Sequence, residues 1–236
     1  MNLILLEPEE LTPDGMACVQ GRRLRHIREV HRAEPGQRLR VGIVNGPMGE
    51  GELVAEEPDR LWLRVQADQP PPPSLPLTLL LALPRPKMLK RILQTVATLG
   101  VERLVLINSY RVEKSFWDSP FLQVAAIREE LVLGLEQARD TRLPEVRLEK
   151  RFKPFVEDQL PAMAAGTRRL VAHPQAAAPC PVAVNAPLTL AIGPEGGFIP
   201  YEVDMLVHRG FEAVHLGPRI LRVETAVTAL LSRLFV

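Results

Sequence analysis

The sequence predicts an α/β protein in which a small β-rich unit precedes a larger domain of alternating strands and helices. Three observations support this prediction. Short alternations of apolar and polar residues fill residues 1–68, a proline run occupies 69–74, and continuous apolar runs alternate with helical patterns over 75–236. Such alternation is typical of a largely parallel sheet. We therefore expect domains at 1–68 and 75–236, joined by a semi-rigid proline linker at 69–74.

The first domain is expected to be a small barrel with one helix. Residues 39–43 and 61–65 alternate as half-buried strands do, and residues 45–49 form a glycine-rich turn before a returning strand at 50–55. Residues 22–30 have the spacing of an amphipathic helix. The side chains that this spacing directs inward are Leu24, Ile27 and Val30 or His31.

The second domain is expected to contain strands covered on both faces, because its apolar runs are continuous. The predicted strands are 77–83, 104–107, 146–148, 170–172, 188–192 and 214–216. The predicted helices are 88–99, 119–138, 154–164, 200–209 and 224–235. Ser119-Pro120 reads as the N-cap and first residue of the second of these helices.

Composition excludes few function classes. The chain has 236 residues, 46% of them apolar, and a formal net charge of +1, so its total charge does not indicate a nucleic-acid partner. Cys18 and Cys180 match no metal or redox spacing, which favours a reducing cytosol. No apolar run approaches the length of a membrane span. We expect a cytoplasmic protein without a metal.

Charge is concentrated near the N-terminus although the total is small. Residues 21–40 hold seven arginines against two acids, Glu29 and Glu34. Such a density can neutralise backbone phosphates, although a solvated helix face has the same composition. The candidate RNA-binding residues are Arg22, Arg23, Arg25, Arg28 and Arg32.

Two glycine-rich loops near the C-terminus form the strongest candidate site. The apolar runs 188–192 and 213–216 end in Gly193 and Gly217, and a helical pattern follows each. Glycine lets the backbone approach a ligand closely, and open α/β sheets bind ligands at the carboxyl ends of their strands. The loops match neither a P-loop nor a dinucleotide fingerprint. They predict two walls of one pocket, whereas either loop alone is also compatible with a tight strand–helix connection.

These loops also carry a resemblance. Ile192-Gly-Pro-Glu-Gly-Gly-Phe198 and Leu216-Gly-Pro-Arg-Ile-Leu-Arg-Val-Glu-Thr-Ala226 resemble the signature of the RsmE family. That family consists of S-adenosylmethionine-dependent enzymes that methylate N3 of one uridine in 16S ribosomal RNA. The resemblance implies a SPOUT-type α/β domain with a trefoil knot, an N-terminal PUA-like RNA-binding β-barrel, and a homodimer. The family usually has glutamate and threonine where this chain has Thr98 and Val223. It also has an arginine near Asp140, for which Arg139 and Arg142 are the nearby candidates.

The resemblance also implies roles for individual residues. Arg222 is expected to stabilise charge or contact RNA, and Glu195 and Glu224 are candidate bases. An Arg–Glu ion pair that braces the knot is an equal alternative for all three, and Glu224 could also stabilise the first turn of a helix. The implied cofactor-binding residues are His173, Ile192, Gly193, Pro194, Gly196, Leu216, Gly217, Ile220 and Leu221.

Two other functions remain open from the sequence. The protein could be a SPOUT methyltransferase of another RNA, or a ribosome-assembly factor that binds RNA without catalysis. The target nucleotide, the identity of any base, and the choice between free RNA and an assembled small subunit as substrate are not determined by the sequence.

Overall fold

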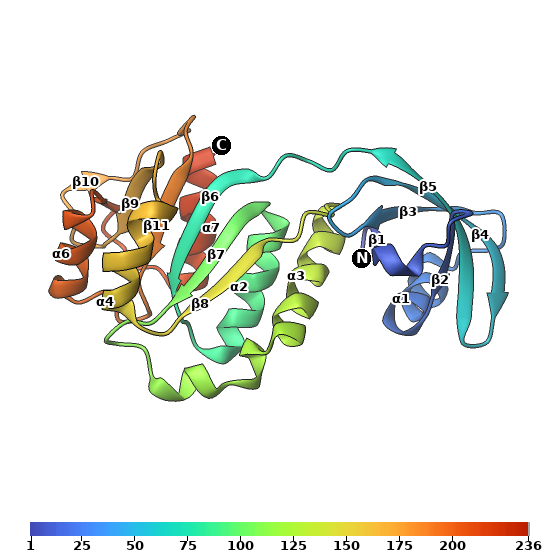
Figure 1. The fold of residues 1–236 in the computed structure, drawn as a ribbon, viewed down its shortest axis with the longest axis horizontal. Coiled ribbons are helices and arrows are strands. Elements are labelled where there is room, and N and C mark those ends of the chain that lie inside the picture. Colours follow the sequence, from blue (N-terminus) through green and yellow to red (C-terminus); the bar gives the residue numbers. More distant parts are fainter. Residues whose placement is uncertain (236) are drawn as a thin grey trace. The chain divides into compact units, whose positions relative to one another are not determined.

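The computed structural model describes residues 1–235, which divide into two compact units (Figure 1). The small unit contains Met1–Pro73 and Leu131–Leu143. The large unit contains Ser74–Glu130 and the chain from Pro144 onward. The sequence placed all of 75–236 in the larger domain, so the inclusion of Leu131–Leu143 in the small unit differs from that expectation.

The small unit is built on a five-stranded mixed sheet. Its strand order is β1-β3-β4-β5-β2, in which β1 runs parallel to β3 and every other pair is antiparallel. Alternate side chains of these strands, among them Val41, Leu53, Leu61 and Leu63, are buried in one apolar core, as the period-2 pattern predicts. The strands are β1 (Ile4–Leu6), β2 (Met16–Val19), β3 (Arg38–Ile43), β4 (Met48–Glu57) and β5 (Arg60–Gln69).

The amphipathic helix of the small unit is shorter and less regular than expected. Helix α1 spans Gly21–His26, and a π-helical turn (η2) continues it over Ile27–His31. Leu24 and Ile27 are buried as predicted, but Val30 is 64% exposed and His31 is also exposed. The prediction for Val30 or His31 was wrong because a π-turn has more residues than an α-turn and rotates later side chains out of the expected stripe.

The segment Leu131–Leu143 joins the small unit through its backbone. The carbonyl of Glu136 accepts hydrogen bonds from the backbone N–H groups of Asn2 and Leu3 at 2.9 and 3.1 Å. Thr141 Oγ1 donates to the Gly46 carbonyl at 2.6 Å, and Asn45 N donates to the Thr141 carbonyl at 2.8 Å. These contacts satisfy the turn before β4 with groups that lie more than ninety positions later in the chain.

The large unit is a seven-stranded sheet in the order β10-β12-β9-β11-β6-β7-β8, and all of its strand pairs are parallel. This confirms the predicted α/β class with a parallel sheet. The strands are β6 (Leu75–Ala82), β7 (Val101–Ile107), β8 (Glu145–Glu149), β9 (Arg168–Ala172), β10 (Ala178–Pro179), β11 (Leu188–Ile192) and β12 (Glu212–His215). The short edge strand β10 was not predicted.

Helices lie between most of these strands, as the sequence pattern indicates, whereas β9, β10 and β11 follow one another without a helix between them. The α-helices are α2 (Pro86–Thr98), α3 (Val124–Ala138), α4 (Phe152–Pro154), α5 (Leu160–Met163), α6 (Pro200–His208) and α7 (Val223–Phe235). A π-helical segment, η5 (Phe155–Gln159), lies between α4 and α5, so the predicted helix at 154–164 is formed from three short pieces.

The predicted start of the long helix at Ser119 was wrong. The Ser119 hydroxyl does act as a cap, accepting from Phe121 N at 3.3 Å, but it caps a single 3₁₀ turn, η4 (Pro120–Leu122). The next residue, Gln123, has an extended backbone, and α3 begins only at Val124. A capping signal marks a helical turn and does not determine how far the helix continues.

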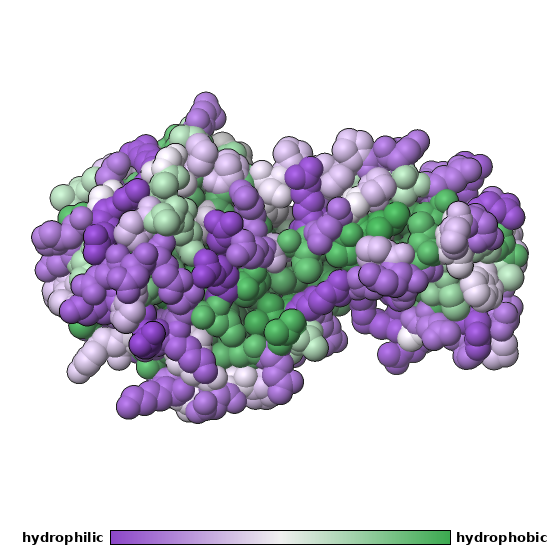
Figure 2. All heavy atoms as spheres, viewed as in Figure 1, coloured by the Kyte–Doolittle hydropathy of each residue, from purple (hydrophilic) through white to green (hydrophobic). Residues whose placement is uncertain are grey.

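The visible surface of the protein is largely hydrophilic. Figure 2 shows hydrophilic residues over most of the visible surface, with hydrophobic spheres gathered in the region of α2.

Within residues 1–235, none of the helices combines the length and the apolar character that crossing a membrane would require.

We predict that Gly49→Ala destabilises the small unit by about 3 kcal/mol, because a methyl group there would collide with backbone that cannot move freely. A Cβ at Gly49 would lie 2.7 Å from Ala67 Cα and even closer to the Gln66 carbonyl in the paired strand β5. Urea unfolding followed by Trp62 fluorescence in a Trp117→Phe background measures this loss, since the chain has two tryptophans.

Gly36→Ala is the matched control. Gly36 also lies in the small unit, with φ of +88° and no heavy atom within 4 Å of the added Cβ, so only the left-handed backbone is strained. Its expected cost is about 1–2 kcal/mol. Equal losses for the two variants would contradict the proposed collision.

Candidate functional site

Loops at the carboxyl ends of the central strands enclose one cavity of about 430 Å³ in the large unit. Strand β11 pairs in parallel with β6 on one side and β9 on the other, and β9 pairs with β12. The loops after β9, β11 and β12 therefore emerge at the same edge of the sheet, where parallel sheets place ligands. The two glycine-rich loops form walls of a single cavity, as the sequence predicted.

The cavity lining includes every residue that the sequence assigned to cofactor binding. These residues are His173, Ile192, Gly193, Pro194, Gly196, Leu216, Gly217, Ile220 and Leu221. Glu195 also lines it, whereas Arg222 and Glu224 are outside the lining.

Close backbone packing shapes the loop after β11. A Cβ on Gly193 would lie 2.8 Å from the backbone nitrogen of Phe198, so no larger residue fits without moving the loop. Gly197 N donates to the Pro194 carbonyl at 2.7 Å and closes the turn between them. Because the loop folds back on itself this tightly, its backbone is presented to the cavity with little freedom.

The loops after β9 and β12 are held together by backbone and imidazole groups. His173 N donates to the Val214 carbonyl at 2.9 Å, and Gly217 N donates to His215 Nδ1 at 2.9 Å. Nδ1 of His173 is buried and has no hydrogen-bond partner among the residues that the structure describes. A buried polar atom without a partner is costly, and its position in the cavity lining fits a polar ligand group as the missing partner.

The three residues predicted to be catalytic lie at the mouth of the cavity or beside it. Glu195 is exposed, and its Oε1 accepts from Arg85 N at 3.3 Å, which joins the loop after β11 to the loop after β6. Arg222 is exposed, and Glu224 lies in the first turn of α7. In the described part of the chain, no ion pair joins Arg222 to either glutamate, so the alternative of a bracing Arg–Glu pair is not observed.

Arg111 is a cavity residue that the sequence analysis missed. It comes from the loop after β7, and its guanidinium donates to the carbonyl of Gly196 in the loop after β11. Its aliphatic part also crowds Gly196, since Cδ would lie 2.9 Å from an added Cβ. The order of strands β11-β6-β7 brings these loops together, and no local sequence signal reports that order.

Glu202 connects the loop after β7 to the end of the loop after β11. This carboxylate is only 3% exposed and accepts from Ser109 Oγ at 3.0 Å, Tyr110 N at 2.8 Å and Ile199 N at 3.0 Å. The first two donors belong to the loop after β7, and the third belongs to the start of α6. Because a buried carboxylate without hydrogen bonds is costly, these three bonds hold the loop after β7 against the start of α6.

The N-terminal arginines divide into paired and free side chains. Arg22 Nη1 lies 2.8 Å from the buried carboxylate of Glu136, and Arg23 donates to Glu10 Oε2 and to the Leu5 carbonyl, both at 2.7 Å. In residues 1–235, Arg25 and Arg32 are exposed and form no ion pair or hydrogen bond through their side chains. The structure therefore leaves two of the candidate RNA-binding arginines free.

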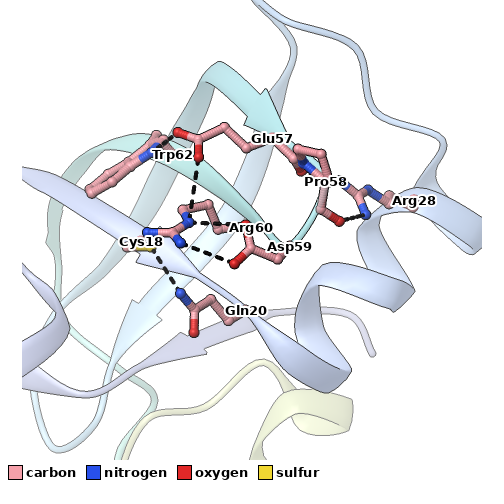
Figure 3. A network of polar contacts seen from close by, with 8 residues as sticks. All are labelled: Cys18, Gln20, Arg28, Glu57, Pro58, Asp59, Arg60 and Trp62. Carbon is pink, nitrogen blue, oxygen red and sulfur yellow. Dashed lines mark hydrogen bonds and ion pairs between the residues drawn. The ribbon is translucent and has the colours of Figure 1, made fainter.

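Arg28 belongs to the paired group and fastens the β4–β5 hairpin (Figure 3). It contacts Glu56 Oε1 at 2.6 Å and the Pro58 carbonyl at 2.8 Å, and it also donates to the Glu57 carbonyl. In the same network, Arg60 lies between the carboxylates of Glu57 and Asp59. The guanidinium of Arg28 is thus already bound by the acidic side chain and carbonyls of the hairpin.

The described residues contain no group of three or more His, Cys, Asp or Glu side chains arranged to hold a metal ion. The rings of His26 and His31 instead contact each other edge to face, with centroids 5.0 Å apart.

Comparison with known proteins identifies the class. Residues 71–235 match the family model described as an RNA methyltransferase domain, which spans most of the large unit. The chain therefore belongs to a family of RNA methyltransferases.

Relatives specify the family further. The chain is 30% identical to the ribosomal RNA small subunit methyltransferase E of Treponema pallidum, over 97% of this chain and 88% of that one. It is 28% identical to the protein of the same name from Mycobacterium bovis, over 92% and 85%. The protein is accordingly a member of the ribosomal RNA small subunit methyltransferase E (RsmE) family.

Solved structures agree on the fold. A ribosomal RNA small subunit methyltransferase E from Neisseria gonorrhoeae, bound to S-adenosyl methionine, aligns with a TM-score of 0.77 at 23% identity, over 98% of this chain and 95% of that one. A putative methyltransferase from Legionella pneumophila, also in complex with this cofactor, aligns with a TM-score of 0.74 at 23% identity, over 98% and 95%.

We predict that Glu10→Gln lowers the stability of the small unit by about 1 kcal/mol at pH 7, and that this loss shrinks as the pH falls and Glu10 becomes protonated in the folded protein. Partial burial raises the pKa of Glu10, but the hydrogen bond and charge of Arg23 outweigh it, so the pKa lies below its ordinary value of 4.5. A lowered folded-state pKa contributes stability above the unfolded value, and this stability is lost as the pH falls through the folded value.

Urea unfolding at several pH values, followed by Trp62 fluorescence, measures this dependence. A difference between wild type and Glu10→Gln that persists unchanged at low pH would show that the pair with Arg23 is not its origin.

Proposed function

We propose that the protein transfers a methyl group from S-adenosylmethionine to N3 of a specific uridine in 16S ribosomal RNA. The observation that supports this most strongly is the single cavity formed by the loops after β9, β11 and β12 in a chain of the RsmE family. The names of the relatives supply the substrate class, and the two cofactor-bound relatives of the same fold supply the methyl donor. Such an enzyme works in the cytoplasm, where ribosomal subunits are assembled.

The residues of the cavity fit such a cofactor. Gly193 and Gly196 line the cavity and carry no side chain, so backbone N–H and C=O groups can approach the adenosine and methionine parts closely. His173 Nδ1 provides a polar atom in need of a partner. When bound, S-adenosylmethionine would supply an activated methyl group on a sulfonium sulfur, and Ile192, Leu216 and Leu221 would offer apolar contacts to it.

The chain itself must hold the uridine and remove its proton. N3 lies on the pairing edge of uracil and carries a proton, so the base must be unpaired and turned into the cavity. As the proton leaves, negative charge spreads to O2 and O4. We assign stabilisation of this charge to Arg222, which is exposed beside the cavity and has no acidic partner in the described chain. Glu195 and Glu224 are the candidate proton acceptors.

We also propose that the small unit is a PUA-like module that binds RNA. Its support is a five-stranded mixed sheet with an adjacent helix that presents Arg25 and Arg32 to solvent. Arg22, Arg23 and Arg28 are engaged by acidic groups or carbonyls, so we expect them to contribute mainly to stability.

Two further features are proposed for the large unit. Ile220, 80% exposed, and Leu221 lie side by side on the cavity loop, which supports a homodimer that covers them. A molecular mass equal to that of one chain, measured by sedimentation equilibrium, would overturn the proposed homodimer. The second feature is a trefoil knot, which membership of the RsmE family supports. Optical-trap stretching to the full unfolded length would exclude it.

The function is tested by transfer of tritium from labelled S-adenosylmethionine to unmodified small subunits and to free 16S RNA, followed by mass-spectrometric mapping of the label. A label at N3 of one uridine is the expected result, and the active substrate identifies the stage of assembly. Cofactor binding without transfer to either substrate would contradict the proposed target.

We predict that Arg222→Ala lowers the rate of methyl transfer about a hundredfold, because one electrostatic donor is removed, and leaves S-adenosylmethionine affinity within roughly tenfold. Single-turnover transfer and calorimetric cofactor binding measure the two effects. Arg222→Lys, which keeps the charge, should retain more activity than the alanine variant. Equal losses of transfer and cofactor affinity would make Arg222 a cofactor-binding or folding residue.

We predict that replacing both Arg25 and Arg32 by alanine reduces the salt dependence of RNA binding, with the slope of log K against log salt falling by about 1.5. Filter binding of 16S RNA at several salt concentrations measures this slope. Arg28→Ala is the control and should lower stability with little change in slope, because its charge is already paired. An unchanged slope in the double variant would remove the small unit from the phosphate contacts.

A further inference from the structure

An exposed aromatic side chain stands beside the cavity. The chain contains two tyrosines, and Tyr110 is 80% exposed, although large aromatic side chains usually cover apolar surface. Tyr110 lies between Ser109, which is buried, and Arg111, which lines the cavity. The backbone of Tyr110 therefore lies next to a residue that lines the proposed methyl-transfer site.

The backbone that carries this ring is fixed. Tyr110 N donates to Glu202 Oε1 at 2.8 Å, and Ser109 Oγ donates to Glu202 Oε2 at 3.0 Å. On the other side, Arg111 donates to the Gly196 carbonyl. A rigid main chain that projects a solvent-exposed ring loses little further entropy when a partner covers the ring, which favours recognition.

The edge of the sheet around Tyr110 is strongly basic although the whole chain is nearly neutral. The segments that follow β6, β7, β8, β9, β11 and β12 are residues 83–87, 108–119, 150–153, 173–177, 193–199 and 216–222. Their basic residues are Arg85, Lys87, Arg111, Lys114, Lys150, Arg151, Lys153, Arg219 and Arg222, and their acidic residues are Glu113, Asp118 and Glu195.

These basic side chains are largely free. Within residues 1–235, Lys153 is the member of this set that forms an ion pair, with Glu157 at 3.8 Å. Lys150 lies over the ring of Trp117, 5.8 Å from its centroid. Unpaired arginine and lysine side chains around an exposed aromatic ring are the combination with which proteins bind single-stranded nucleic acid, through phosphates and stacked bases.

We propose that Tyr110 is a stacking platform for an unpaired base of the substrate RNA at the rim of the cavity, with the surrounding basic loops holding the phosphates. This proposal rests on the proposed function and adds to it a residue that positions the RNA. Stacking on Tyr110 would hold the strand while the target uridine enters the cavity.

RNA fits this surface better than a second copy of the chain. The loops after the adjacent strands β7 and β8, residues 108–119 and 150–153, carry five basic and two acidic residues, so two copies meeting there face to face would bring like charges together. The homodimer proposed above would instead cover Ile220 and Leu221 on the loop after β12. Like-charge contacts across an interface are unfavourable, whereas an RNA backbone supplies the opposite charge.

The test compares Tyr110→Ala with Tyr110→Phe, which keeps the ring. The Kd for unmodified 16S RNA, the KM for the RNA substrate and the Kd for S-adenosylmethionine are measured for each. Tyr110→Ala should raise the RNA Kd and KM by roughly 5- to 100-fold, the range found when a stacked aromatic is removed, with cofactor affinity unchanged. Tyr110→Phe should stay within about twofold of wild type, since it retains the stacking ring.

Val124→Ala is the matched surface control, because Val124 also belongs to the large unit and is 83% exposed. It should bind RNA like wild type. An RNA Kd for Tyr110→Ala that equals that of Val124→Ala would overturn the proposal. A change in the oligomeric state of Tyr110→Ala would overturn it as well, by assigning the ring to a protein interface.

Photo-cross-linking separates this proposal from the proposed function, because it needs no turnover. 16S RNA transcribed with 5-iodouridine is irradiated with the protein, and the attached peptide is identified by mass spectrometry. Attachment to the peptide containing Tyr110 supports stacking even if methyl transfer fails. Methyl transfer by the wild type, with attachment only elsewhere, would contradict stacking and leave the methyltransferase function intact.

Discussion

The parallel pairing of β11 between β6 and β9 is the constraint on which the rest of the large unit depends. Ile192, the last residue of β11, is in register with Leu81 of β6 and Ala172 of β9. Parallel strands in register release their following loops at one edge. The cavity lies where these loops meet, and the loop around Gly193 is closely packed against its own backbone at Phe198.

Polar contacts then fix the positions of the loops at the carboxyl ends of these strands. Glu202 accepts three hydrogen bonds from two different loops, and Arg111 spans from one of them to the Gly196 carbonyl. Because an unsatisfied buried carboxylate is costly, the loops have few alternative positions. The same contacts hold the cavity loop and the exposed ring of Tyr110, so cofactor binding and the proposed RNA stacking share one support.

The unpaired positive charges lie in different places from those that a count of arginines along the sequence suggests. The densest run of arginines lies at residues 21–40, yet Arg22, Arg23 and Arg28 are directed to acidic partners or carbonyls of the small unit. The carboxyl edge of the large sheet collects charges that are scattered along the sequence. A phosphate backbone responds to unpaired charge in space, so both surfaces contribute to the RNA contacts that we propose.

The sequence by itself determined the α/β class, the parallel sheet and the two glycine-rich loops of the cavity, because apolar periodicity and glycine-rich strand ends are local signals. It also carried the resemblance that the RNA methyltransferase match and the RsmE relatives confirm. The individual cavity residues came from the family resemblance. Only the tertiary structure decided the inclusion of Leu131–Leu143 in the small unit, the outward position of Val30, the start of α3 at Val124, and the meeting of Arg111 with Gly196. Each of these depends on which distant groups satisfy a backbone or side-chain hydrogen bond, and strand order sets those partners over separations that local patterns do not record.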